Sequence, residues 1–351
     1  MPRILSVGTA VPPHRFSQEE IQESCGEDFA EAFERGRGSL FANSGVAHRH
    51  LVERRPYYFR RESFEARNRA YFEHAMALST SALASCLDRA GMTHRDVDHI
   101  VSVTTTGLLT PSLEAHLAQA LPFRRTVKRT PLFGAGCAGG AVALARAQEY
   151  LRGHPSETAV VLSTELCSLT FLPSEGTMTQ LVAAALFGDG AAAVLLCGDE
   201  HPAAGRAKVE VLDSGSALIP DSLDIMGWDF GAHGMRLVLS PRAPELIEQE
   251  CRAAVEPFLR KAGLELSVVG SFLLHPGSVR ILDALERALG LSPLDTDLSR
   301  VFLSRYGNLS SASVLFILGA ALEAGPPARP HALLAALGPG FACELTLLRW
   351  L

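Results

Sequence analysis

The stretch Gly134-Ala135-Gly136-Cys137-Ala138-Gly139-Gly140 lies between an apolar, strand-like run and an alanine-rich helix predicted over residues 141–151. Small residues on both sides of the thiol allow the backbone to turn sharply and allow a substrate to approach the sulfur. A thiol at a helix start also lies at the positive end of the helix dipole, which favours the thiolate. The stretch therefore predicts a nucleophilic Cys137 at a strand-to-helix turn.

Outside this turn, the chain repeats one plan of helices and strands at an offset of about 172 residues. In the first half, a helix is predicted over residues 73–89 and a strand over residues 99–104. In the second half, a helix over residues 245–260 precedes a strand over residues 269–274. Alternating helices and strands indicate largely parallel sheets covered by helices.

The helix at the thiol has a counterpart too. Asn308 precedes a helix predicted over residues 311–322, just as Cys137 precedes its own helix, and a strand follows in both halves, over residues 159–163 and 332–337. Any α/β chain contains similar echoes, but three landmarks at one offset favour a true duplication.

We therefore expect an internally duplicated α/β fold of layered sheets and helices. Its first half covers residues 1–200 and its second half residues 201–351. The segment 198–206, rich in glycine, proline and charge, is the expected boundary.

His275 directly follows the predicted strand 269–274, at the strand end where ligands gather in parallel α/β sheets. The duplication should bring both helix starts and this strand end to one point, so that Cys137, His275 and Asn308 converge. Taken singly, these residues read as a small turn residue, a corner residue and a helix cap. Together, at matched positions, they predict a catalytic site.

A Cys–His pair suits nucleophilic attack on an acyl carbonyl. In a cysteine hydrolase, the asparagine would orient the histidine. In a decarboxylating condensing enzyme, the His275 Nε2–H and the Asn308 amide would instead stabilise the enolate that forms when a malonyl thioester loses CO₂. A carboxylate in place of Asn308 would repel that enolate.

Composition excludes several other classes of protein. The net charge of −6 and the absence of a Lys/Arg block argue against a nucleic-acid partner. No apolar stretch is long enough to predict a membrane span, and the N-terminus does not read as a signal peptide. Seven cysteines without a CxxC pair fit reduced thiols in a cytoplasmic protein better than disulfides or zinc.

Over nearly its whole length, the chain resembles the type III polyketide synthases, the chalcone-synthase-like branch of the thiolase-fold condensing enzymes. The motifs that carry the resemblance are GCAGG at 136–140, ALFGDGAAA at 185–193, HPG at 275–277, YGNLSSA at 306–312 and GPGF at 338–341. The resemblance implies a thiolase-like αβαβα sandwich and a homodimer. It also implies acyl-CoA and malonyl-CoA as substrates, with no metal, nicotinamide or flavin cofactor.

The resemblance further implies roles for individual residues. Cys137 would carry the starter acyl group and the growing chain, while His275 and Asn308 would promote decarboxylation of malonyl-CoA. Phe187 matches a gatekeeping phenylalanine between the CoA tunnel and the cavity. The family's loop that scaffolds the cyclisation cavity corresponds to Gly338, Pro339 and Gly340.

Some positions depart from the plant pattern. Leu237 replaces a second gatekeeping phenylalanine, Trp228 a pocket glycine and Cys167 a pocket threonine. The combination of LCSLT at 166–170, MGWD at 226–229 and TGLLTPS at 106–112 resembles bacterial enzymes that make alkylpyrones or alkylresorcinols from fatty acyl-CoA. Trp228 would fill the space of an aromatic starter, and a linear chain would use an apolar tunnel, favoured by about 0.8 kcal/mol per buried CH₂. Its expected lining is Thr105, Thr106, Leu108, Cys167 and Leu237.

CoA phosphates should meet basic residues. Arg280, Arg35 and Arg37 are the candidates, although each also reads as an ordinary surface arginine.

The leading alternative to a type III polyketide synthase is a ketoacyl-carrier-protein synthase of the third type, which would have the same fold and triad and perform a single condensation. A non-catalytic acyl-CoA-binding relative would be expected to lose Cys137, His275 or Asn308, and this chain keeps all three.

Overall fold

The structure is a computed structural model of the chain that describes residues 1–26, 29–30, 39–60, 62–231 and 234–351. Within these residues, nine strands form one sheet in the order β11-β12-β13-β8-β1-β7-β6-β4-β5. The strands are β1 (Arg3–Ala10), β4 (His99–Val103), β5 (Lys128–Leu132), β6 (Thr158–Leu166), β7 (Asp189–Cys197), β8 (Val209–Leu218), β11 (Val269–Leu274), β12 (His331–Gly338) and β13 (Ala342–Trp350).

The strand order repeats itself, which confirms the duplication. The run β4-β6-β7-β1 in the first half and the run β11-β12-β13-β8 in the second are each joined by one parallel and then two antiparallel pairings. The two runs meet only where Arg3 and Ile4 of β1 pair with Glu210 and Val209 of β8. The boundary at residue 200 stays a prediction.

The expectation of largely parallel sheets was wrong. Among the strands of the described residues, only β4–β5, β4–β6 and β11–β12 pair in parallel. The turn Pro339–Phe341 that joins β12 to β13 is too short for a crossover helix, and a connection of this length allows only an antiparallel pair.

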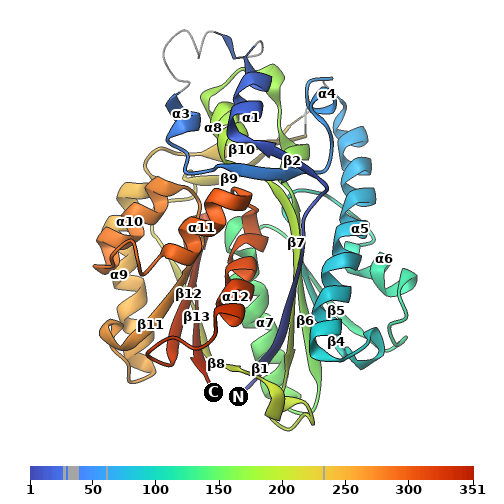
Figure 1. The fold of residues 1–351 in the computed structure, drawn as a ribbon, viewed down its shortest axis with the longest axis vertical. Helices are drawn as coiled ribbons and strands as arrows, with labels where there is room; N and C mark the ends of the chain where they lie inside the picture. The colour runs from blue at the N-terminus through green and yellow to red at the C-terminus, as the bar shows by residue number, and fades with distance from the viewer. Residues whose placement is uncertain (27–28, 31–38, 61, 232–233) are drawn as a thin grey trace.

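Eleven helices of the described residues cover the strands in layers (Figure 1). They are α1 (Gln18–Cys25), α3 (Ser39–Ala42), α4 (Arg55–Tyr58), α5 (Phe64–Ala90), α6 (Leu113–Ala120), α7 (Gly139–Gly153), α8 (Met178–Leu186), α9 (Ala243–Lys261), α10 (Val279–Leu289), α11 (Asp297–Tyr306) and α12 (Ser313–Ala324). Two small two-stranded antiparallel sheets complete the fold, β2 (His14–Ser17) with β3 (His48–Leu51) and β9 (Met226–Gly231) with β10 (Gly234–Leu239).

The layers follow from strands that are apolar on both faces. In β6, Ala159 and Val161 join the central core with α7 and α12, whereas Val160 and Leu162 join the core under α5. A third core packs α9 and α10 on β11, β12 and β13. Helices α7 and α12 thus lie between the two sets of strands, with α5 on one outer side and α9 and α10 on the other (Figure 1). This is the expected αβαβα sandwich.

Helices α7, α9 and α12 lie within a few residues of their predicted ranges, whereas α5 begins at Phe64 rather than at residue 73. The side chain of Ser63 accepts a hydrogen bond from the Ala66 amide and begins α5, and Gly91 ends it in the left-handed conformation at φ 62°. None of the helices in the described part of the chain combines the length and apolar character that crossing a lipid bilayer requires. The cytoplasmic location stays a prediction.

Candidate active site

Cys137, His275 and Asn308 line the same cavity, which has a volume of about 500 Å³. Each lies where one element ends and another begins. Cys137 lies in the short 3₁₀ turn Gly136–Ala138 before α7, His275 follows β11, and Asn308 precedes the 3₁₀ turn Ser310–Ala312 before α12. The convergence expected from the duplication is therefore present in the fold.

Two glycines after the thiol allow the two helix starts to meet. A Cβ on Gly140 would lie 2.3 Å from the carbonyl oxygen of Ser311, and one on Gly139 would lie 2.6 Å from the Cγ2 atom of Val103. Neither position has room for a side chain. The pair Gly139-Gly140 therefore holds the start of α7 against the start of α12, which brings Cys137 beside the asparagine turn.

The sulfur of Cys137 lies 3.7 Å from the hydroxyl of Ser310. Burial raises the pKa of this thiol to about 11, and the nearby carboxylate Glu165 acts in the same direction. Hydrogen bonds from the side chains of Ser310 and Asn308 lower the pKa, but by less. In this structure burial therefore favours the protonated thiol of Cys137, and not the thiolate expected from its place at a helix start.

His275 is a buried imidazole, 3% exposed, whose backbone N–H donates to the Ala335 carbonyl at 2.8 Å. Neither ring nitrogen has a hydrogen-bond partner among the described residues. Burial lowers its pKa to about 4, so the ring is neutral at physiological pH. A neutral imidazole offers one donor and one acceptor, and two unpaired nitrogens in a cavity wall are the mark of a site that awaits a ligand.

Asn308 is held on both its backbone and its side chain. Its N–H donates to the Leu186 carbonyl at 2.8 Å, and its own carbonyl accepts from Gly188 at 3.0 Å. In the side chain, Oδ1 accepts from the Ser310 N–H at 2.8 Å and Nδ2 donates to the Gly277 carbonyl at 3.2 Å. The carboxamide both caps the following turn and lines the cavity, with one N–H beyond its bond to Gly277.

A buried carboxylate behind the triad escaped the sequence analysis. Glu165 accepts hydrogen bonds from the Thr105 N–H and hydroxyl, each at 3.0 Å, from the Thr106 hydroxyl at 2.8 Å, and from Ser311. Burial raises its pKa. A charged residue near the end of an apolar strand was the available signal for Glu165. Ser310, a polar residue at the helix start two residues after Asn308, could likewise have been identified from the sequence as part of the site.

The pocket residues expected from the sequence mostly line this cavity. Those that do are Thr105, Thr106, Cys167, Phe187, Trp228, Leu237 and Pro339. Trp228 and Leu237 lie opposite each other in the β9–β10 hairpin. Leu108, Gly338 and Gly340 are not among the lining residues. A Cβ on Gly338 would lie 2.3 Å from the Ala135 carbonyl oxygen, so this glycine packs behind the thiol loop instead.

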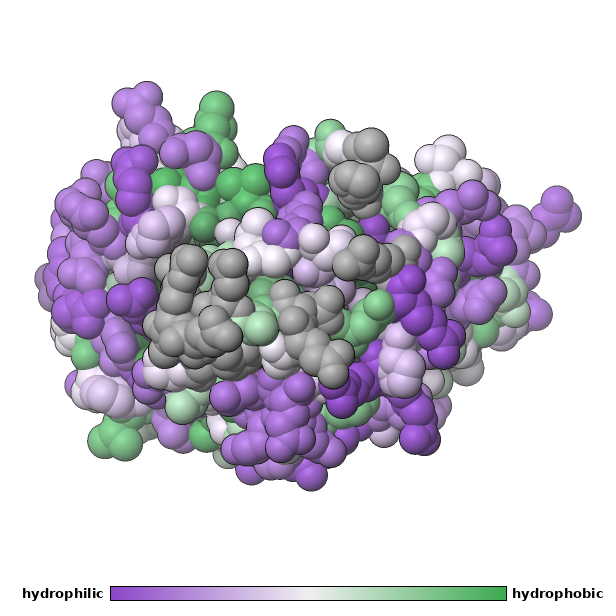
Figure 2. Space-filling model, turned by 90° about the horizontal axis from the view of Figure 1, so that it is seen from above, coloured by the Kyte–Doolittle hydropathy of each residue, from purple (hydrophilic) through white to green (hydrophobic). Residues whose placement is uncertain are grey.

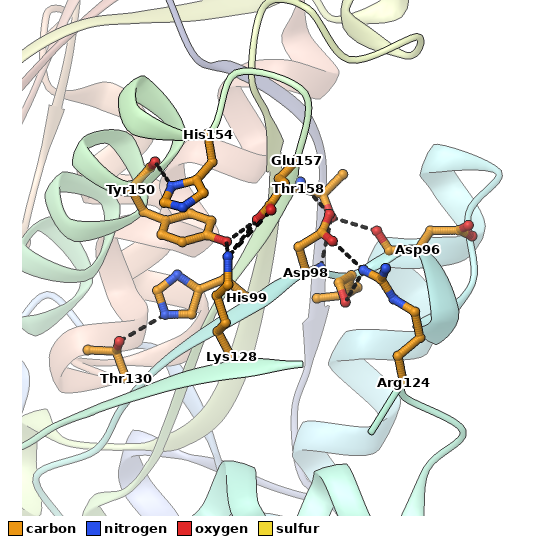
Figure 3. A network of polar contacts seen from close by, with 11 residues as sticks. Asp96, Asp98, His99, Arg124, Lys128, Thr130, Tyr150, His154, Glu157 and Thr158 are labelled. Atoms are coloured by element: carbon orange, nitrogen blue, oxygen red, sulfur yellow. Dashed lines mark hydrogen bonds and ion pairs between the residues drawn. The ribbon is translucent and has the colours of Figure 1, made fainter. Parts of the chain in front are cut away.

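The charged side chains that line the cavity, among the described residues, are all positive. Arg49, Arg55 and Arg280 line it, and no aspartate or glutamate does among the described residues. Arg280 and Arg55 are exposed, at the first turn of α10 and at the start of α4. Figure 2, which views the molecule from above, shows mostly hydrophilic residues around the border of this face. Arg35 and Arg37 lie outside the described residues.

Comparison with known proteins decides the family. The N-terminal domain of chalcone and stilbene synthases matches residues 2–200, and the C-terminal domain of the same synthases matches residues 210–351. The chain belongs to the chalcone and stilbene synthase family. It is 40% identical to a 1,3,6,8-tetrahydroxynaphthalene synthase of Streptomyces peucetius over 99% of this chain and 93% of that protein. It is 37% identical to a putative chalcone synthase of Bacillus subtilis over 99% of this chain and 98% of that one.

Solved structures agree with this assignment. The tetrahydroxynaphthalene synthase of Streptomyces coelicolor, a bacterial type III polyketide synthase, superposes with a TM-score of 0.93 at 30% identity, covering 99% of each chain. The type III domain of Steely1 from Dictyostelium gives a TM-score of 0.92, also at 30% identity and 99% coverage of both chains. The expected type III polyketide synthase and its thiolase-like fold are confirmed, and with them an acyltransferase activity.

Proposed function

We propose that this type III polyketide synthase condenses a fatty acyl-CoA starter with malonyl-CoA units and cyclises the product to an alkylpyrone or an alkylresorcinol. The observation that supports the chemistry is that a thiol, a neutral imidazole and a carboxamide, on Cys137, His275 and Asn308, line one cavity. The proposed substrates are acyl-CoA and malonyl-CoA, and the proposed reaction uses no metal or other cofactor.

Loading begins with a protonated thiol. As the sulfur of Cys137 attacks the thioester carbonyl of the starter, the free ring nitrogen of His275 accepts the proton. The bond between the acyl carbon and the CoA sulfur then breaks, and His275 returns the proton to the departing CoA thiolate. The depressed pKa of His275 favours this return, since the imidazolium is the less stable form in the buried site.

Condensation uses the same groups in another role. The thioester oxygen of malonyl-CoA accepts hydrogen bonds from the His275 N–H and the Asn308 N–H. When the bond to the carboxylate breaks, CO₂ leaves and the oxygen becomes an enolate, which two neutral donors in a dry cavity stabilise. The enolate carbon attacks the acyl carbon on Cys137, the bond between that carbon and the Cys137 sulfur breaks, and the released thiolate takes up a proton from solvent.

The shape of the cavity favours a linear starter. Trp228, which is paired with Leu237, lines the cavity together with Phe187, and Leu237 and Phe187 are the residues proposed to gate it. The same lining contains the apolar residues Ile21, Leu40, Phe59, Phe171 and Val182. Each CH₂ buried there is worth about 0.8 kcal/mol, so affinity should rise with chain length.

For the CoA phosphates, we propose Arg280, joined by Arg55. Neither has an ion-pair partner among the described residues, both line the cavity, and their exposure leaves them free to meet a phosphate. The proposal keeps Arg35 and Arg37 as further candidates.

We also propose a homodimer. β5 is one of the two edge strands of the sheet, and three of its five residues are exposed. The exposed ring of Phe133, which follows β5, lies with its centroid 6.4 Å from that of the exposed Phe230 ring. An unpaired edge with adjacent apolar rings favours a second copy. Light scattering of the purified protein tests this, and a monomer at micromolar concentration would contradict it.

A second candidate comes from the relatives. The chain is 40% identical to a 1,3,6,8-tetrahydroxynaphthalene synthase, which favours as second candidate the formation of a polyhydroxylated aromatic product from malonyl-CoA alone, without a fatty starter. The two candidates share the triad and differ only in what first loads Cys137.

The test is a product analysis. Purified protein is incubated with malonyl-CoA and a series of acyl-CoA starters of increasing length, and the products are identified by mass spectrometry. A parallel incubation contains malonyl-CoA alone. Alkylated pyrones or resorcinols, formed faster with longer starters, support the proposal. A naphthalene-type product from malonyl-CoA alone supports the second candidate, and the unchanged acid of each starter would indicate a hydrolase.

A further inference from the structure

Arg49, on β3, is the largest fully buried side chain in the described part of the chain, 1% exposed. All four of its hydrogen bonds go to neutral oxygens: Gln18 Oε1 and the carbonyls of Ala184, Ala185 and Phe187. Burial lowers its pKa to about 10, so it keeps its charge at neutral pH. The nearby Asp189 carboxylate favours the charge, but no carboxylate of the described residues accepts a hydrogen bond from the guanidinium. A buried cation without such a partner is costly, so its presence at this position calls for a reason.

The carbonyls that Arg49 binds belong to one short segment. Ala184 and Ala185 lie in the last turn of α8, where carbonyls lack partners within the helix, and Phe187 is the next residue after the helix. Nη2 donates to Ala185 at 2.9 Å, while Nη1 reaches Phe187 at 3.2 Å and also Ala184. A cation at a helix C-terminus is also favoured by the helix dipole. The guanidinium therefore fixes the end of α8 and the backbone of Phe187 together.

This segment is bonded directly to Asn308. The Leu186 carbonyl accepts from the Asn308 N–H at 2.8 Å, and the Gly188 N–H donates to the Asn308 carbonyl at 3.0 Å, so that Phe187 and Asn308 form a parallel bridge. The contact is tight, because a Cβ on Gly307 would lie 2.5 Å from the Leu186 carbonyl oxygen. A shift of residues 186–188 must move Asn308 with it.

Gln18 sets the orientation of the guanidinium. Its Oε1 accepts from Arg49, while its Nε2 donates to the Ser44 hydroxyl at 2.7 Å, to the Ala185 carbonyl at 3.0 Å and to the Phe41 carbonyl at 3.2 Å. The planar fork of arginine reaches several carbonyls at fixed angles, which the single ammonium of lysine cannot do.

We propose that Arg49 is a positioning residue for decarboxylation: by fixing the end of α8 and Phe187, it holds the Asn308 amide at the place where the enolate oxygen develops. The inference rests on the role proposed above for Asn308. It separates Arg49 from the loading step, because the approach of Cys137 to a starter thioester does not use the Asn308 backbone bridge.

The test measures two half-reactions in Arg49→Lys, which keeps the charge and loses the fork. Acylation of Cys137 by a starter acyl-CoA is followed by intact-protein mass, and decarboxylation of malonyl-CoA by the formation of acetyl-CoA. We expect acylation to stay at the wild-type rate and the kcat of decarboxylation to fall by about tenfold or more, with KM for malonyl-CoA unchanged. Arg67→Lys is the control, because Arg67 is also a buried arginine but lies on α5 and donates to the Phe171 carbonyl at 3.3 Å.

Each outcome decides the matter. Equal loss of both half-reactions would assign Arg49 a merely structural role, and no loss of either would also overturn the proposal. Should Arg49→Lys fail to fold, Gln18→Leu removes the acceptor that orients the guanidinium and must reduce decarboxylation selectively, by a smaller factor. If the wild-type protein neither acylates nor decarboxylates, the proposed function itself has failed, which is a different result from a wild type that does both.

Discussion

The two halves of the molecule end their matching strands in opposite ways. β4 ends at Val103 and is followed by Thr104, while β11 ends at Leu274 and is followed by His275. The Thr104 hydroxyl accepts a hydrogen bond from the Tyr71 hydroxyl at 2.7 Å. Neither ring nitrogen of His275 has a hydrogen-bond partner within the part of the chain that the structure describes. The duplication supplies two equivalent strand ends. The side chain after β4 is hydrogen-bonded within the fold, whereas the side chain after β11 presents an imidazole without a described hydrogen-bond partner to the cavity.

The starts of α7 and α12 also differ, in how firmly hydrogen bonds hold the residue that precedes each helix. The same sequence offset separates Cys137 from Asn308 as separates the two strand ends. Asn308 is fixed by four hydrogen bonds on its backbone and side chain, whereas the sulfur of Cys137 has only weak contacts, such as that to Ser310. A preorganised donor must be rigid, and a nucleophile must be free to form a bond. The first half therefore carries the reacting atom and the second half carries the donors.

Removing the contribution of the first half should have the largest effect. In Cys137→Ala, we expect product formation to fall below detection, because no acyl carrier remains, while decarboxylation of malonyl-CoA stays within about tenfold of the wild type. Acetyl-CoA release and product mass are measured in parallel. Loss of both activities to the same extent would contradict the division of roles between the halves.

Changing the donor of the second half should be the next largest effect. Asn308→Asp replaces an N–H donor with a carboxylate that repels the enolate, and we expect the kcat of decarboxylation to fall by about 10²- to 10³-fold. Acylation of Cys137, followed by intact-protein mass, serves as the control and should persist. Normal release of CO₂ from this variant would remove the enolate-stabilising role.

The two strand ends can be compared through stability. The pKa of His275 is lowered to about 4 in the folded chain from an ordinary value of 6.5, so the unfolded chain binds a proton that the folded chain does not. Stability is therefore lost as the pH falls from 6.5 to 4, by up to about 3 kcal/mol. In urea titrations at pH 6.5 and at pH 4, the free energy of unfolding of His275→Gln should therefore fall less between the two pH values than that of the wild type.

Thr104→Val provides the matched substitution in the first half. It should cost about 1 kcal/mol through the lost hydrogen bond with Tyr71, by the same amount at both pH values. If both variants show the pH slope of the wild type, the buried neutral His275 is not the source of that slope.

The smallest effect is expected at the cavity rim. Arg280→Ala should raise KM for malonyl-CoA by about two- to fivefold at low salt, because an exposed ion pair with phosphate is weak, and leave kcat unchanged. Arg305→Ala is the control, since Arg305 is exposed on α11 and is not a lining residue. An equal response in both variants would deny Arg280 a specific phosphate contact.

Much of this site could be predicted from local sequence. The duplication, the helix starts at Cys137 and Asn308, and the strand end before His275 all follow from periodicity and from glycine-rich turns, which act over a few residues. The motifs around them were specific enough to indicate the family, and the comparisons confirm it.

Other properties depend on contacts between segments far apart in the chain. The shifted pKa values of Cys137 and His275 follow mainly from burial, which arises only when distant segments pack around these side chains. The bonds of Arg49 to the end of α8, and the antiparallel pairings of β7, β8 and β13, join residues that no local pattern relates. Local patterns determine which elements form, whereas solvation, charge and long-range pairing arise only when those elements pack together.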